Sequence, residues 1–120
     1  MAFSEIELKK IEILVGGLCR KHTHALEKDL LRIDYNILDD EVLILECRPL
    51  ERDPDEWLKF PVARIQFNPE TEEWQLFSQQ PDGVWVTCIH CPATTDLLQV
   101  VTMIDINRKQ AFFREPVKLV

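Results

Sequence analysis

The chain has 120 residues, of which 46% are hydrophobic and 29% charged, and this composition excludes disordered, collagen-like and low-complexity classes. No apolar run reaches the roughly 18 residues of a membrane-spanning helix, so we expect no membrane partner, and the first residues lack a signal-peptide pattern. The formal charge is −7, from 14 basic and 21 acidic residues, so we expect no nucleic-acid partner. Residues 1–120 are therefore predicted to form one cytoplasmic domain.

The first predicted element is a helix that begins at Ser4. Ser4 and Glu7 have the spacing of a capping box, and apolar residues then recur near helical spacing through about Lys21. Gly16 and Gly17 lie inside this helix, where each glycine costs about 1 kcal/mol relative to alanine. We therefore expect the glycine pair to permit either close packing or a kink.

Three strands are predicted next. Alternating apolar and polar residues over 31–37 and 42–48 indicate a hairpin with its turn at 39–41. A third strand is expected over 58–67, where Pro61 indicates an edge position or a bulge because it cannot donate to the ladder.

The remaining elements complete an antiparallel fold. Strands are predicted over 74–77 and 84–89, and the short turns at 68–71 and 80–83 require antiparallel neighbours. A second helix, capped by Thr94 or Thr95, is expected to end near Asn107 and to be followed by Phe112 and Phe113. The fold class is α+β, with an N-terminal helix, a five-stranded antiparallel meander and a C-terminal helix, both helices on one face.

Scattered residues over nearly the whole chain resemble a family of small bacterial proteins catalogued only as a domain of unknown function. The residues that carry the resemblance are Phe3-Ser4-Glu5, Arg48-Pro49, Pro61-Val62-Ala63-Arg64, Trp74-Gln75-Leu76-Phe77, the Trp85 strand and Phe112-Phe113. The resemblance implies a bacterial single-domain protein. It supplies no catalytic or binding residues.

Four cysteines raise the question of a metal site. Cys88 and Cys91 have CxxC spacing, and Cys19 and His22 form a Cys-x-x-His pair, so the four would make a Cys3His zinc site if the two pairs converged. Our main expectation is that the thiols are reduced and that no cofactor is bound, with Cys19 and Cys47 as small buried residues. A thioredoxin-like function does not fit, because a proline follows Cys91 and the second helix begins only later.

The three histidines are the candidates for acid–base chemistry. His22 and His24 are predicted in a loop after the first helix, where surface histidines are usually solvated. A second alternative is a small hydrolase-like enzyme with His22, His24 or His90 at a pocket between helix and sheet. The acidic runs at 39–41 and 53–56 do not fit a calcium-binding loop.

The preferred function is a non-enzymatic binding module. Two helices can cover only one face of the sheet, and the last three strands carry apolar residues on both faces. The predicted interaction face contains Ile65, Phe67, Phe77, Val84 and Val86. We expect a homodimer or another protein partner on it. In the alternative, the 51–56 connection and the Phe112-Phe113 tail cover this face within one chain.

Overall fold

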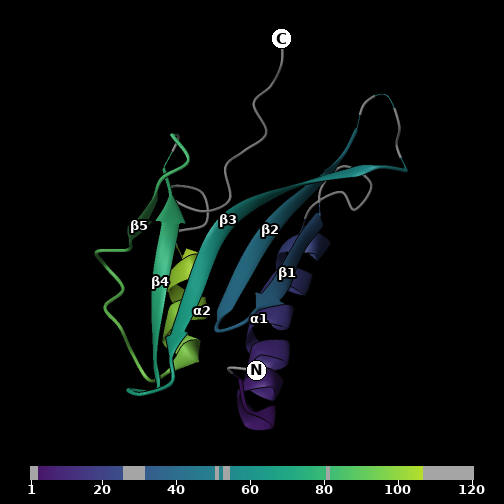
Figure 1. Ribbon diagram of the computed structural model, residues 1–120. Coiled ribbons are helices and arrows are strands. Elements are labelled where there is room, and N and C mark those ends of the chain that lie inside the picture. Colours follow the sequence, from purple (N-terminus) through teal and green to yellow (C-terminus); the bar gives the residue numbers. More distant parts are fainter. Residues whose placement is uncertain (1–2, 26–31, 51, 53–54, 81, 107–120) are drawn as a thin grey trace.

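A computed structural model shows two helices packed on a five-stranded antiparallel sheet (Figure 1). It describes all residues except 1–2, 26–31, 51, 53–54, 81 and 107–120. The elements in chain order are α1 (Glu5–Ala25), β1 (Arg32–Leu38), β2 (Glu41–Pro49), β3 (Trp57–Asn68), β4 (Glu73–Gln79), β5 (Trp85–Thr87) and α2 (Leu97–Ile106). The strand order β1-β2-β3-β4-β5 confirms the predicted meander and fold class.

Helix α1 begins with the predicted capping box. The Ser4 backbone N–H donates to Glu7 Oε1 at 2.8 Å, and the Glu7 N–H donates to Ser4 Oγ at 3.2 Å. The helix continues to Ala25, beyond the predicted end near Lys21. The prediction that His22 and His24 lie in a loop was therefore wrong, because both belong to the last turns of α1.

Gly16 explains how α1 approaches the sheet. A Cβ atom at this position would lie 3.6 Å from Cε1 of Tyr35 on β1. The helix backbone thus packs closely against the Tyr35 ring, which confirms close packing, one of the two explanations that the sequence left open. Gly17 has more space, since a Cβ there would meet only Arg20 Nη2, at 4.0 Å.

Strand β3 contains a bulge. The pairing of β2 with β3 shifts between Ile44 and Leu45, which face Ala63 and Pro61, so Val62 is the extra residue. Pro61 therefore marks a bulge, the second of the two predicted possibilities. The edge position holds as well, because among the described strands residues 57–62 of β3 pair only with β2, and pairing with β4 begins at Ala63.

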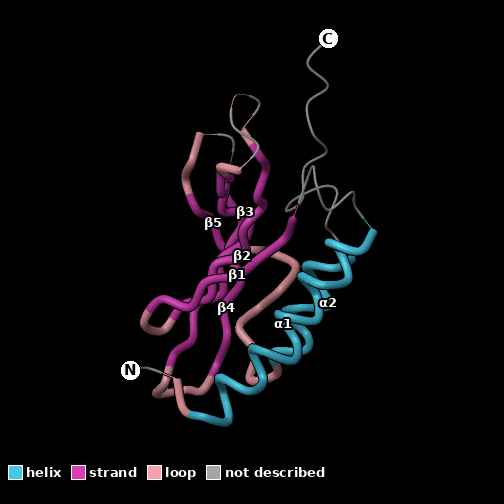
Figure 2. The backbone as a smooth tube through the Cα atoms, turned by 90° about the vertical axis from the view of Figure 1, so that its right-hand side faces the viewer, coloured by secondary structure: helices cyan, strands magenta, loops and turns pink. Residues whose placement is uncertain are grey.

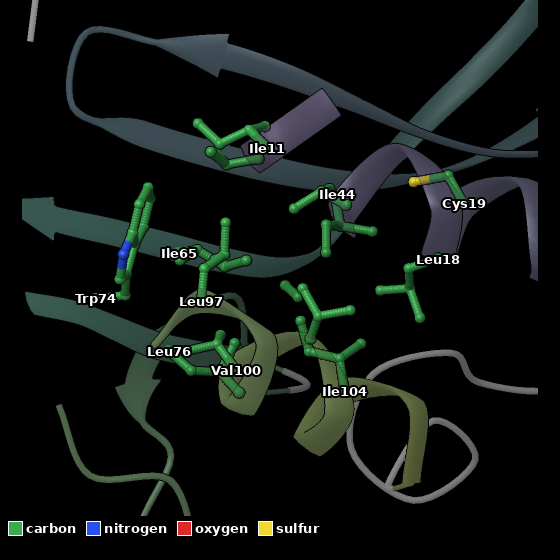
Figure 3. Close-up of a cluster of buried hydrophobic side chains, with 14 of the residues drawn as sticks. Ile11, Leu18, Cys19, Ile44, Ile65, Trp74, Leu76, Leu97, Val100 and Ile104 are labelled. Atoms are coloured by element: carbon green, nitrogen blue, oxygen red, sulfur yellow. The ribbon is translucent and has the colours of Figure 1, made fainter. Parts of the chain in front are cut away.

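The hydrophobic core lies between the helices and one face of the sheet, and both helices are on this same face, as predicted (Figure 2). The largest fully buried side chains include Ile11 of α1, Ile44, Ile65 and Leu76 of the sheet, and Ile104 of α2 (Figure 3). We call this side of the sheet the helix face. Burial of these side chains supplies most of the stabilisation that the fold needs against chain entropy.

Helix α2 is capped by a residue that we did not predict. Asp96 Oδ1 accepts the backbone N–H of Leu98 at 3.1 Å, so Asp96 occupies the capping position instead of Thr94 or Thr95. Thr94 has another role: its backbone exchanges hydrogen bonds with Trp74 of β4, at 2.7 and 3.1 Å. The predicted helix end at Asn107 and the Phe112-Phe113 tail lie outside the described residues.

Candidate functional site

The candidate site is the sheet face that points away from the helices, which we call the open face. Cross-strand partners lie on the same face of a sheet, so the strand register defines it. Its central row, from β1 to β5, is Asn36, Leu43, Arg64, Phe77 and Thr87. Among the described residues, no helix packs on this face.

Arg64 organises the centre of the open face. Its Nη2 forms an ion pair with Oε1 of Glu41, and its guanidinium lies 5.4 Å from the centroid of the Phe77 ring. The Arg64 Nε atom is buried and has no hydrogen-bond partner among the described residues. The centre of the face therefore combines a paired charge with an aromatic surface, a composition found in protein interfaces.

The far end of the open face, opposite the β1–β2 and β3–β4 turns, carries basic and aromatic side chains. The Arg32 guanidinium lies 4.2 Å above the centroid of Trp57. Cys47, between Arg32 and Lys59 in the register, is only 5% exposed although no described helix covers it. Burial, followed by the nearby Asp34 carboxylate, raises the pKa of the Cys47 thiol.

The turn end of the open face, next to the β1–β2 and β3–β4 turns, is hollow. We call this cavity, of about 390 Å³, the turn-end pocket. Its polar lining includes the carboxylates of Asp40 and Glu73 and the amides of Gln66, Asn68 and Gln75, beside the Phe77 ring. No lysine or arginine among the described residues lines this pocket, so it presents acceptors and negative charge.

The predicted interaction face needs correction at most of its residues. Ile65 pairs with Leu76 and Phe67 with Trp74, and all four are buried on the helix face. Val86, opposite Ser78, lies on the helix face as well, because Ser78 pairs with the core residue Ala63. Val84 precedes β5 and is 53% exposed. Phe77 is the one predicted residue that the register places on the open face.

The predicted zinc ligands are not brought together. Among the described residues, no three His, Cys, Asp or Glu side chains are grouped so that they could hold a metal ion. Cys88 and Cys91 lie in a tight turn, in which the Cys91 N–H donates to the Cys88 carbonyl at 3.2 Å. Cys19 and Cys91 are buried, and burial raises the pKa of the Cys19 thiol to about 12, so Cys19 carries little nucleophilic thiolate near neutral pH.

His22 joins the two helices. Its Nε2 lies 3.0 Å from Oδ1 of Asp105 on α2, and Lys21 Nζ donates to Oδ2 of the same carboxylate at 2.7 Å. The Lys21 hydrogen bond is the main cause that holds the pKa of Asp105 below its usual range. Sequence reasoning missed this link because its partners are 83 and 84 residues apart and share no local pattern.

Among the described residues, neither helix combines the length and the apolar composition of a membrane-spanning segment.

Comparisons with known proteins identify a family but no characterised relative. Neither a curated protein nor a solved structure matches the chain. The model of a family described as a domain of unknown function, DUF3024, matches residues 3–114. The match covers almost the entire sequence and confirms the resemblance to such a domain: the chain belongs to the DUF3024 family.

Proposed function

We propose that this protein is a non-enzymatic interaction module whose open face packs against a second copy of the chain, forming a homodimer. The observation that carries the proposal is the composition of this face. Leu43 and Phe77 lie beside Arg64, and Trp85 and Trp57 lie nearer the far end; all four are only half-buried on this face, and no described element covers them. Partly exposed aromatic side chains on an uncovered sheet face are typical of protein interfaces.

The size of the open face suits a dimer. The five strands have 7, 9, 12, 7 and 3 residues, and each residue covers about 3.3 Å along its strand and about 4.8 Å across it. The area is therefore about 600 Å² for each copy, within the roughly 600 to 1,000 Å² that one partner contributes to a standard interface.

The charges on the face favour a second copy as the occupant. Lys59 and Arg32 lie at the far end, whereas Asp40 and Glu73 line the pocket at the turn end. Two copies that pack face to face with their strands antiparallel bring unlike ends together. This local complementarity offsets the mutual repulsion of two chains that each carry a formal charge of −7.

Sedimentation equilibrium tests the proposal. At about 50 µM protein we expect a mass near twice the 14.1 kDa of the chain. The Phe77→Asp variant places a charge in the proposed interface and should be monomeric while keeping its circular dichroism spectrum. Ile13→Asp is the matched control, since Ile13 is an exposed apolar residue on α1 and its replacement should leave the dimer intact. A wild-type mass near 14.1 kDa would contradict the proposal.

A further inference from the structure

We propose that the turn-end pocket binds an alkylammonium group, and that the group it takes is the side chain of Lys59 from the second copy. This inference rests on the proposed function and specifies how the two open faces fit together. It assigns a role to the pocket and to an exposed lysine, neither of which the fold itself requires. A two-fold dimer would contain this contact twice.

The lining of the pocket has the chemistry that an ammonium group needs. Neither Asp40 nor Glu73 has an ion-pair or side-chain hydrogen-bond partner among the described residues, although both are half-buried. Gln75 donates through Nε2 toward the carbonyls of Leu76 and Cys91, at 3.3 and 3.4 Å, which leaves its Oε1 as an acceptor. An ammonium group has three N–H donors and no acceptor, so acceptor oxygens and two carboxylates complement it.

Lys59 is the matching donor on the same face. It is exposed, and among the described residues it forms no ion pair. Its cross-strand partner on β2 is Cys47, whose own partner on β1 is Arg32. Neither residue of this row at the far end therefore supplies a carboxylate to Lys59. A lysine stem is long and flexible, and its charged end reaches well beyond the surface of the sheet.

A simple two-fold arrangement brings these groups together. Lys59 and the pocket residue Gln66 both belong to β3 and are seven residues apart, about 23 Å along an extended strand. A two-fold axis in the interface, perpendicular to β3 and passing between Val62 and Ala63, places Lys59 of each copy over Gln66 of the other. Sheets that pack face to face are about 10 Å apart, a gap that a lysine side chain can bridge into a pocket.

Charge reversal tests the contact. Lys59→Glu and Glu73→Lys should each raise the dimer dissociation constant about tenfold, because each creates a like-charge pair at both symmetric contacts. The double variant restores unlike charges at both contacts, and we expect its dissociation constant within about threefold of the wild type. Lys10→Glu changes the net charge by the same amount as Lys59→Glu on the exposed side of α1, and it should have no effect.

The possible outcomes distinguish the Lys59 contact from the homodimer itself. A dimer that Lys59→Glu weakens no more than Lys10→Glu does, or a double variant no tighter than the singles, would overturn the Lys59 contact while leaving the homodimer standing. If Glu73→Lys weakens the dimer but Lys59→Glu does not, the pocket binds a cation other than Lys59, and the Lys59 contact is again overturned. A monomeric wild type would refute the proposed function itself. If Glu73→Lys does not fold, Asp40→Lys combined with Lys59→Glu provides the same test.

Discussion

The glycine pair in α1 gives the most direct test of helix packing. Gly17→Ala removes the conformational cost of a glycine in a helix interior, which is about 1 kcal/mol. The new Cβ would meet only the end of the Arg20 side chain at 4.0 Å, an ordinary contact, so nothing offsets the gain. We expect the free energy of unfolding to rise by about 1 kcal/mol and the Tm by about 4 °C for a domain of this size.

Gly16 should respond differently because of its neighbour on β1. A Cβ there would lie 3.3 Å from Arg20 Nη1, which is flexible, and 3.6 Å from Tyr35 Cε1. Gly16→Ala should therefore gain less than Gly17→Ala, and Gly16→Leu should destabilise the protein because a longer side chain meets the Tyr35 ring.

Urea unfolding followed by circular dichroism measures all three variants, with Lys10→Ala as an exposed control on the same helix. The reasoning fails if Gly17→Ala is neutral or destabilising, or if Gly16→Leu is tolerated.

Three further predictions concern the core, the helix link and the thiols. Ile65→Ala should lower the free energy of unfolding by about 3 kcal/mol in urea titrations, because Ile65 is fully buried on the helix face; a loss under about 1 kcal/mol would speak against that placement. Since Asp105 has a lowered pKa in the folded state, its stabilising effect should be present above about pH 4 and lost as the pH falls further. Asp105→Asn should then be less stable than the wild type at pH 6, with the difference shrinking as the pH falls below about 4; a constant difference would disprove this. In thiol labelling at pH 8, Cys88 should react before Cys19, whose thiol has a pKa of about 12 and is buried; equal rates would contradict the burial.

The order of elements could be predicted because each has a local signal. The Ser4–Glu7 capping box determined the start of α1, and the alternation over 31–37 and 42–48 determined the first hairpin. Turn residues then required antiparallel neighbours. These signals act within a few residues, and the structure preserves them.

The residues that make up the candidate site are determined by pairing between strands and by contacts between distant parts of the chain. No local sequence pattern shows these contacts. Alternation shows that Ile65 and Gln66 point to opposite faces, but only the pairing of Ile65 with Leu76 shows which face is the core. The bulge at Val62 also reverses the alternation partway along β3. His22 was misplaced for a related reason, since its partner Asp105 belongs to the other helix.

Contacts between early and later parts of the chain also have a consequence for synthesis of the protein on the ribosome. Phe3 stacks on Trp74 at a centroid distance of 5.7 Å, and Lys21 pairs with Asp105, so residues made first contact residues made late. While α2 is still inside the exit tunnel, the nascent sheet has a helix face that only α1 can shield. We therefore expect a stalled nascent chain ending before Leu97 to need chaperone protection, and the domain to reach its native state only after translation has passed Ile104.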